Sequence, residues 1–385
     1  MKGKRIFVVV GGMIAFLALC GIVVRGAKAQ SGSAPATAKP AGPKTAEEQF
    51  KNIQVLKGIP ADQLIPAMQF ISASLGVECE FCHVQGAFQK DDKKAKQIAR
   101  KMIAMMFAIN KDNFAGHRQV TCYSCHRGST RPVGMPPVMT EEPKPGPDEA
   151  NRTEGAEEAS GPLAAQLFDK YLQAVGGAGA VSKVTSRVMK GTITFGDSNI
   201  PIDIFAKAPD KRVSLMHTPD GDSVTAFDGH EGWLSFPGRP VREMHGPDID
   251  GASMDADLQF AAHLTGMFSK AETQGTEQVD GHDAYLVIGE REGKPPLKLY
   301  FDKQSGLLVR LVRYEETPLG RLPTQIDYAD YRKEGDVKIP LRWTLARPGG
   351  RFTVQLSEVK QNIPVDDAKF AQPPAPSAGH KGPGM

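Results

Sequence analysis

Two pentapeptides of the pattern Cys-x-x-Cys-His contain the residues of this chain best suited to chemistry. They run from Cys79 to His83 and from Cys122 to His126. The pattern is typical of covalent haem attachment, because two thiols on one turn can each form a thioether while the adjacent histidine binds iron. The sequence therefore predicts two covalently bound haem c groups. Their attachment residues would be Cys79, Cys82, Cys122 and Cys125, and their proximal iron ligands His83 and His126.

Other uses of paired cysteines have to be weighed against this interpretation. Four of the five cysteines in the 385-residue chain lie in the two motifs, which are 43 residues apart. Two Cys-x-x-Cys pairs with a similar separation can bind zinc, and a single pair can be a thioredoxin-like redox site. Neither alternative needs a histidine directly after both pairs, whereas haem attachment does. The motifs therefore favour haem over zinc or a dithiol.

Residues 1–29 have the pattern of an export signal. Basic residues are followed by an apolar run over residues 6–24 and by an Ala-x-Ala sequence ending at Ala29, after which cleavage is expected. The run is also long enough to span a bilayer, so an uncleaved membrane anchor is an alternative. Cys20 is either the modified cysteine of a lipoprotein or an apolar residue of the run. A cleaved signal, an uncleaved anchor and a lipoprotein signal would all place the rest of the chain outside the cytoplasm, facing the periplasm.

The composition of the chain divides it into segments. Proline, glycine and charged residues mark the stretches that have little to bury. The net charge of +3 is too small to indicate a nucleic-acid partner. The predicted segments are a flexible leader (30–46), a domain with both haem motifs (47–131), a Pro-rich acidic linker (132–162), a strand-rich domain (163–372) and a disordered tail (373–385).

Two amphipathic helices are expected before the motifs, over residues 60–76 and 92–110. Their apolar stripes, expected to face inward, are Leu64, Met68, Ile71 and Leu75 in the first and Ile98, Met102, Met105 and Ile109 in the second. Asn110 is expected to close the second helix. Met68 and Met102 are candidates for the distal iron ligands, since methionine sulfur stabilises Fe(II). Core filling is the alternative role for each, and the neighbouring methionines of the second helix compete with Met102.

Residues flanking the motifs are typical of a known family. The matching stretches are Lys51–Leu56, Cys79–Val84, Arg100–Met102 and Val120–Gly128. Residues 50–131 thereby resemble the tetrahaem cytochrome subunit of photosynthetic reaction centres in purple bacteria. In that family a helix methionine before each of the first two haem motifs is the sixth iron ligand. The resemblance therefore implies that Met68 and Met102 bind iron and that the chain transfers single electrons.

The chain departs from that family in two ways. It has two haem motifs where the family has four. The family also has a histidine before its second motif that binds the fourth haem, and His117 lies near that position. His117 is thus a vestige, a surface histidine, a ligand to a haem of another subunit, or an alternative sixth ligand for the second haem.

A basic run surrounds the start of the second helix. It could guide an acidic redox partner, or it could be a solvated helix face. Its members are Lys90, Lys93, Lys94, Lys96, Arg100 and Lys101.

Residues 163–372 contain many short runs of alternating polarity, separated by turn residues. Strands are expected over 187–195, 200–207, 211–217, 222–228, 231–236, 284–290, 297–302, 307–315, 323–331, 337–345 and 351–360. Helices are expected over 163–181 and 254–270. This order predicts a strongly curved antiparallel sheet closed on one side.

Four further stretches of this region match a second known family and indicate its fold more than an activity. They are Tyr300–Val309, Asp327–Tyr331, Val337–Pro340 and Asn362–Phe370. They resemble the periplasmic lipoprotein-carrier superfamily, whose fold is a half-barrel around an apolar cavity. The resemblance implies a site for a lipid or another apolar ligand, and a closed, dry core is the alternative. The histidines of this region are scattered and have no metal-ligand spacing.

The predicted fold class is therefore multidomain: a small all-α dihaem cytochrome c domain followed by an α+β curved antiparallel half-barrel. The predicted function is relay of single electrons between redox proteins, either a membrane electron-transfer complex or a soluble carrier, with photosynthetic electron transport as one setting. A dihaem peroxidase, with one five-coordinate iron, and a haem-tethered lipid-binding protein are the alternatives. The sequence does not predict an oligomeric state.

Overall fold

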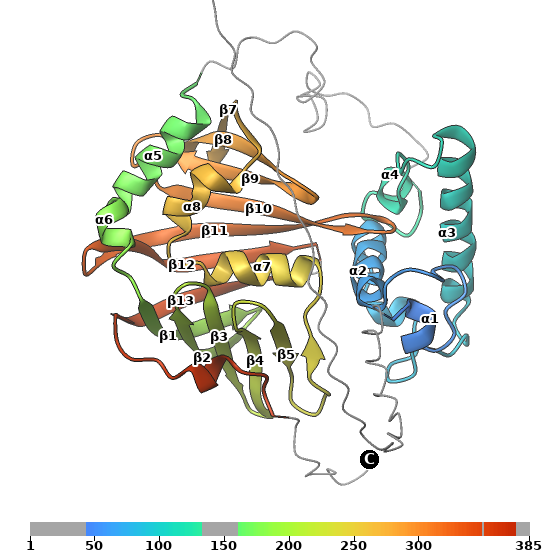
Figure 1. Cartoon of the computed structure of the whole chain (residues 1–385). Helices are drawn as coiled ribbons and strands as arrows, with labels where there is room; N and C mark the ends of the chain where they lie inside the picture. The colour runs from blue at the N-terminus through green and yellow to red at the C-terminus, as the bar shows by residue number, and fades with distance from the viewer. Residues whose placement is uncertain (1–43, 133–160, 349, 375–385) are drawn as a thin grey trace, which may run out of the picture. The chain divides into compact units, whose positions relative to one another are not determined.

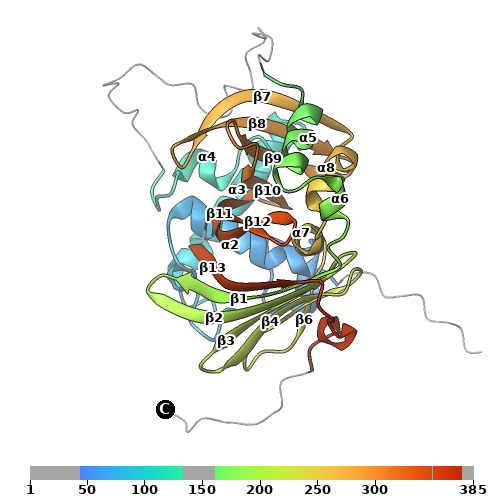
Figure 2. The ribbon, with the colours of Figure 1, turned by 90° about the vertical axis from the view of Figure 1, so that its left-hand side faces the viewer.

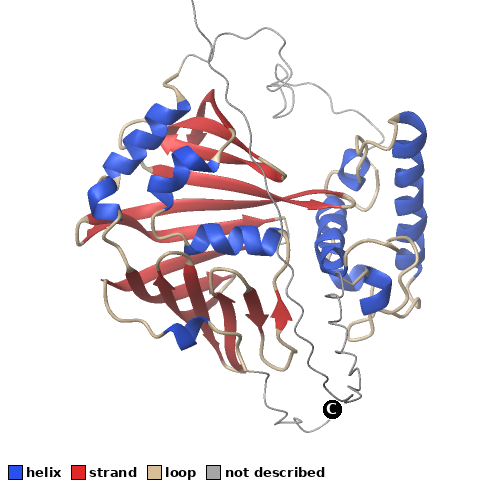
Figure 3. Ribbon diagram, in the orientation of Figure 1, coloured by secondary structure: helices blue, strands red, loops and turns tan. Residues whose placement is uncertain are grey.

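The computed structural model describes residues 44–132, 161–348 and 350–374. The predicted signal or anchor, most of the leader, nearly all of the linker and most of the tail lie outside the described residues. In the part that is described, no helix is long and apolar enough to cross a membrane. A helical N-terminal region precedes a large antiparallel sheet (Figures 1 and 3), as the sequence predicted.

The N-terminal region consists of short helices and the loops between them. They are α1 (Ala46–Gln49), η1 (Ala61–Gln63), α2 (Leu64–Leu75), η2 (Cys79–Phe81), α3 (Lys94–Asn113) and α4 (Cys122–His126). Both predicted helices are confirmed. Gly76 ends α2 with a φ of 65°, a left-handed conformation that glycine adopts without strain. Asn110 does not end its helix, because α3 continues to Asn113.

The apolar core of this region is formed mainly by α2 and α3. Its buried residues include Leu64, Ala67 and Phe70 of α2 with Ile103 and Met106 of α3. The inward stripe predicted for the second helix was therefore wrong. Ile98, Met102 and Met105 are 48%, 40% and 48% exposed. Helix α3 has apolar residues on two faces, and periodicity alone cannot tell which face meets the core.

The sheet has thirteen strands in the order β6-β5-β4-β3-β2-β1-β13-β12-β11-β10-β9-β8-β7, and every neighbouring pair is antiparallel. Pairing of β1 with β13 joins the first and last strands at the middle of the sheet. The strands are β1 (Ser186–Phe195), β2 (Ser198–Lys207), β3 (Lys211–Thr218), β4 (Gly221–Phe227), β5 (Gly232–Ser235), β6 (Arg242–Glu243), β7 (Lys270–Val279), β8 (His282–Arg291), β9 (Lys294–Asp302), β10 (Leu308–Thr317), β11 (Gly320–Glu334), β12 (Val337–Arg347) and β13 (Gly350–Gln361).

All eleven predicted strands are found, and the two that the sequence did not predict are the edge strands β6 and β7. The sequence of β7 is mostly polar, and only Thr273 and Val279 are buried in it. An edge strand has one neighbour and needs few apolar residues, so it gives no alternating pattern.

Four helices lie on one face of the curved sheet (Figures 1 and 2). They are α5 (Ala164–Ala174), α6 (Ala178–Val181), α7 (Pro247–Ala256) and α8 (Phe260–Met267), and a 3₁₀ turn, η3 (Asp367–Phe370), follows the last strand. The prediction of one helix over 163–181 was wrong. Gly176 and Gly177 have φ values of 127° and 80°, which no right-handed helix contains. Two helices result.

The helix predicted over 254–270 is also two helices. Helix α7 begins well before that range and ends at Ala256. The Asp257 carboxylate then accepts a hydrogen bond of 2.9 Å from the backbone N–H of Gln259. This contact competes with helical pairing and is typical of a helix boundary.

The helices pack on the sheet through a continuous apolar core. Leu167, Phe168 and Tyr171 of α5 and Leu264 of α8 are buried with residues from both halves of the sheet. The Phe168 and Phe301 rings meet edge to face, with their centroids 5.8 Å apart. The result is a curved sheet with one helix-covered face, as expected for a half-barrel.

Candidate functional site

Each Cys-x-x-Cys-His motif folds into a short helical turn. In the first, the backbone N–H groups of Cys82 and His83 both donate to the Cys79 carbonyl, at 3.3 and 3.0 Å. In the second, α4 spans the whole motif from Cys122 to His126. Because residues three apart share one face of a helical turn, the two thiols of each motif lie on the same face.

The cysteines of each motif differ in burial. Cys79 and Cys125 are exposed, whereas Cys82 and Cys122 are half-buried. Burial raises the pKa of the Cys82 and Cys122 thiols. Among the described residues, no group of three or more His, Cys, Asp or Glu side chains converges as a metal ion would need.

The motif histidines are oriented in the same way. His83 Nδ1 lies 2.9 Å from the Phe88 carbonyl oxygen, and His126 Nδ1 lies 2.9 Å from the Ser129 carbonyl oxygen. A carbonyl can only accept, so each Nδ1 donates, and in the neutral ring Nε2 keeps a lone pair. Metal-binding histidines are commonly fixed in this way through their other nitrogen. Both rings can thus bind iron through Nε2.

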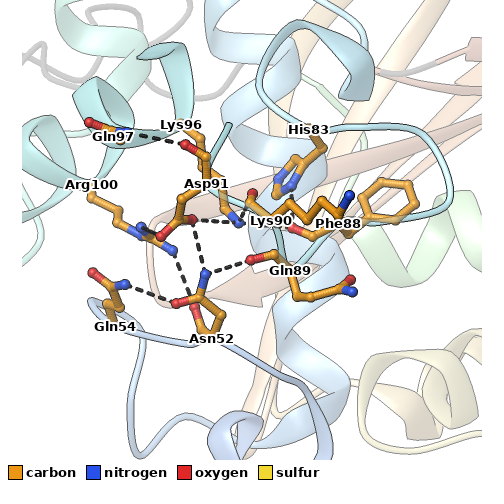
Figure 4. A network of polar contacts seen from close by, with 10 residues as sticks. All are labelled: Asn52, Gln54, His83, Phe88, Gln89, Lys90, Asp91, Lys96, Gln97 and Arg100. Atoms are coloured by element: carbon orange, nitrogen blue, oxygen red, sulfur yellow. Dashed lines mark hydrogen bonds and ion pairs between the residues drawn. The ribbon is translucent and has the colours of Figure 1, made fainter. Parts of the chain in front are cut away.

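The carbonyl that orients His83 belongs to a larger polar network (Figure 4). The Phe88 carbonyl also accepts a hydrogen bond of 2.9 Å from Lys96 Nζ. The same ammonium donates to the Lys90 carbonyl at 2.7 Å and pairs with the Asp91 carboxylate at 3.0 Å. Lys96 is only 8% exposed. One buried lysine therefore holds the loop that positions the first motif histidine.

Asp91 links this loop to two more segments. Its carboxylate accepts 2.9 Å hydrogen bonds from Arg100 and from the Asn52 side chain, and Asn52 also donates to the Gln89 carbonyl at 2.5 Å (Figure 4). Hydrogen bonds from Arg100, then Lys96 and Asn52, hold the pKa of Asp91 well below its usual range. The carboxylate stays ionised at neutral pH and ties residues 88–91 to α3 and to the segment at Asn52.

The side chains of the predicted basic run therefore fall into two groups, those bonded within the protein and those exposed to solvent. Lys96 and Arg100 are paired with Asp91, and Lys93 donates to the Glu80 carbonyl. The exposed members of the run are Lys90, Lys94 and Lys101.

Asn110 holds the segment of chain that directly precedes the second motif. This residue is 5% exposed within α3. Its Oδ1 accepts hydrogen bonds from the backbone N–H groups of Gln119 and Val120, at 3.0 and 2.9 Å, and its Nδ2 donates to the Val120 carbonyl at 2.7 Å. The chain is thus clamped to α3 immediately before Thr121 and Cys122.

The loop after the second motif packs against the end of α2. The Gly128 N–H donates to the Ser74 carbonyl at 2.9 Å. A Cβ atom at Gly76 would lie 2.3 Å from the Gly128 carbonyl oxygen, closer than any real contact. Glycine is therefore needed at position 76 for two reasons: its φ is left-handed, and the Gly128 carbonyl lies too close for a side chain. This close contact holds α4 beside α2.

The three candidate distal ligands differ in their surroundings. Met68 is half-buried against the apolar core of the helical region. Met102 is 40% exposed on the outer face of α3. His117 is exposed, and its ring has no polar partner within the described residues; its backbone alone is hydrogen-bonded, to Phe114 and Gln119.

Large apolar side chains are exposed around both motifs. The set consists of Phe81, Phe88, Ile98, Met102, Met105 and Tyr123, each between 40% and 56% exposed. Exposed apolar side chains on the motifs, on the loop after the first motif and on α3 are available to contact a ligand. Together with paired thiols on one face of a turn and a histidine presenting Nε2, they fit a covalently held porphyrin.

Comparison with known proteins agrees with these motifs. Residues 22–216, about half of the chain, match the family described as photosynthetic reaction centre cytochrome C subunit. The chain belongs to this family. Its c-type cytochrome character follows from that membership.

Curated relatives match a shorter stretch. The photosynthetic reaction center cytochrome c subunit of Thermochromatium tepidum is 36% identical over 95 residues, which is 24% of this chain and 23% of that protein. Cytochrome c-554 of Chloroflexus aurantiacus is 34% identical over 85 residues, 20% of each chain. The chain thus spans about a quarter or less of the length of these relatives.

The chain also has a weak likeness to solved structures of another kind. A DUF1329 family protein from Desulfovibrio piger is 16% identical, with a TM-score of 0.39 and coverage of 54% of this chain and 96% of that one. A LolA superfamily protein from Nitrosomonas europaea is 14% identical, with a TM-score of 0.38 and coverage of 55% and 98%. These likenesses are weak, and nothing about a ligand follows from them.

Proposed function

We propose that the chain is a periplasm-facing c-type cytochrome with two covalently attached haem c groups, which relays single electrons between redox proteins. The main support is the matched geometry of the two motifs, in which each histidine is held through Nδ1 by a backbone carbonyl. A bound haem c supplies an iron that changes its charge by one electron. The family makes a membrane electron-transfer complex or a soluble carrier the expected partner, and photosynthetic electron transport one setting.

Each residue type has a separate task in this proposal. Cys79 and Cys82 hold one haem and Cys122 and Cys125 the other, through thioethers. His83 and His126 bind iron through Nε2. Hydrogen bonds from Nδ1 to backbone carbonyls keep both rings from rotating and raise their basicity as ligands. The carbonyl that serves His83 is itself held by a buried ammonium, so this ring is supported from two directions.

Met68 and Met102 are proposed as the distal ligands. The thioether of Met68 lies at the edge of the apolar core, where water is largely excluded. Met102 lies among exposed apolar side chains on α3. A methionine on each iron would favour the reduced state and close the site to substrates, which suits an electron carrier better than a peroxidase. His117, exposed and without a side-chain partner in the described residues, remains the alternative for the second haem.

Spectra of single variants test these assignments. In Met68→Ala and Met102→Ala, one haem should lose its methionine-to-iron charge-transfer band, become high-spin when oxidised, and fall in reduction potential. His117→Ala should leave both haems unchanged. If both methionine variants keep wild-type spectra and potentials, the distal assignments are wrong.

Met105→Ala is the matched control for Met102, because it lies one turn further along α3 and is similarly exposed, at 48% against 40%. It should leave both haems unchanged. Haem content is tested separately: the intact protein should carry two haems, and the variant with Cys122 and Cys125 both replaced by serine should carry one.

A further inference from the structure

The half-barrel has a partly open cavity of about 200 Å³ between its sheet and helices. Apolar residues from distant strands form much of the wall, including Met189 of β1, Leu311 of β10, Ile326 of β11 and Trp343 of β12. The cavity therefore suits a small molecule.

Two arginines lie side by side in the wall of this cavity. Arg187 of β1 is paired in register with Ala206 of β2, and Ala206 is paired with Arg212 of β3. All three line the cavity. The row spans two strand separations, or about 10 Å. Because Ala206 has only a methyl group, the space between the two long side chains stays open toward the cavity.

Neither arginine has a hydrogen bond or an ion pair to the described part of the protein. The Nε atom of Arg187 is buried without a partner. Burial lowers the pKa of Arg187 to about 10 and also lowers the pKa of Arg212. Glu334 attracts Arg187 and Asp255 attracts Arg212, in each case without an ion pair within 4 Å. Both residues are half-buried, and cations that are partly removed from water without a partner are costly.

The other charged groups of the wall are already satisfied. Asp255 pairs with Arg313 at 3.1 Å, and Asp257 pairs with His263 at 2.7 Å. These carboxylates therefore form their ion pairs elsewhere, and neither is paired with Arg187 or Arg212.

Three tyrosines add polar groups to the same wall. Tyr171 and Tyr331 both line the cavity, and the Tyr331 hydroxyl donates to the Leu308 carbonyl at 2.7 Å. Burial raises the pKa of Tyr328, which keeps its hydroxyl protonated. A neutral hydroxyl near two guanidinium groups is a further donor for an anion.

We propose that this cavity binds a compact organic anion, with its carboxylate between Arg187 and Arg212 and its apolar body against the aliphatic and aromatic wall. Guanidinium groups pair with carboxylates through strong, often bidentate hydrogen bonds. The mixture of an apolar wall and a few convergent polar groups is typical of a small-molecule site. The proposal does not depend on the electron-transfer function.

Calorimetric titration of the intact haem-loaded protein tests the ligand class, with octanoate as the probe. Octan-1-ol has the same chain without the charge, acetate has the charge without the chain, and palmitate has a longer chain. Octanoate should bind at least tenfold more tightly than each of the other three. Equal binding of octanol would mean a purely apolar site, equal binding of acetate a simple anion site, and tighter binding of palmitate a lipid site. Each of these three results would overturn the proposal.

Variants test the arginine pair. Arg187→Met and Arg212→Met should each weaken octanoate binding about 10- to 100-fold, since each removes charge-assisted hydrogen bonds. Arg239→Met, at an exposed arginine outside the cavity wall, should bind as the wild type does.

Thermal unfolding without ligand separates binding from a structural role. Removing an unpaired, partly buried charge should leave the melting temperature unchanged or raise it. A lower melting temperature in both cavity variants would mean that the arginines serve the fold, and the proposal would fail.

Discussion

Replacing Asn110 should release the segment that leads into the second haem motif. In Asn110→Leu the side chain keeps its size but loses both polar atoms. The Val120 N–H and C=O groups then have no partner, whereas the Gln119 N–H still reaches the His117 carbonyl at 2.9 Å. Two unpaired, partly buried backbone groups cost about 1 kcal/mol each. The local free energy of opening should therefore fall by about 2 kcal/mol.

Hydrogen–deuterium exchange followed by mass spectrometry measures this change directly. A loss of about 2 kcal/mol corresponds to roughly 30-fold faster exchange in the peptide that contains Gln119 and Val120. In Asn110→Asp the carboxylate still accepts from both N–H groups but cannot donate to the Val120 carbonyl. Its exchange rate should lie between those of the wild type and the leucine variant.

Asn113→Leu is the matched control on the same helix. Asn113 is exposed and makes one side-chain hydrogen bond, of 3.1 Å, to the Ile109 carbonyl. Its replacement should change the opening free energy by less than about 0.5 kcal/mol. The assignment of the clamp to Asn110 would be refuted if the peptide exchanged at the wild-type rate in Asn110→Leu. It would also be refuted if Asn113→Leu increased the exchange rate as much as Asn110→Leu does.

Three further outcomes are expected. Gly76→Ala should lower the melting temperature of the helical region, because its Cβ meets the Gly128 carbonyl oxygen at 2.3 Å, whereas Gly116→Ala, which has positive φ but no atom nearby, should cost less. Burial raises the pKa of Glu315 from 4.5 to about 7, so the folded state binds more protons between those pH values and stability falls as pH rises through them. Glu315→Gln should therefore stabilise the protein by about 1–2 kcal/mol at pH 8 and not at pH 4.5, as urea unfolding would show. The pKa of Asp91 is lowered from 3.8, so its contribution to stability is present at neutral pH and is lost as pH falls below 3.8. Asp91→Asn should make the loop after the first motif exchange faster at pH 7, and that loop should no longer loosen further on acidification.

The candidate haem site could be predicted in part because its chemistry is local. The spacing of two cysteines and a histidine within one turn is set by a few consecutive residues, so Cys79–His83 and Cys122–His126 stand out in the sequence. The groups that support them are not local. Lys96 and Asn110 contact segments that are distant along the chain or lie beyond a loop. Asparagine is unfavourable inside a helix, so the position of Asn110 within α3 was a weak signal for a special role.

Much of the fold was likewise predictable, and the errors have physical causes. Alternating polarity marked the eleven central strands, whereas the polar edge strand β7 gave no such pattern. The glycines that interrupt residues 163–181 were visible, but only their φ values show that they separate two helices. Which face of α3 points inward depends on the elements that pack against the helix. Ile103 and Met105 are both apolar, but only Ile103 is buried.

The sequence by itself determined the chemistry that depends on neighbouring residues: paired thiols with an adjacent histidine, and strands with one apolar face. Tertiary structure decided which groups meet across the chain. It brought the Phe88 carbonyl to both His83 and Lys96, and it aligned Arg187 and Arg212 on either side of Ala206 in neighbouring strands. Strand register and helix packing set these contacts, and both result from burial summed over the whole domain, so no local stretch of sequence specifies them.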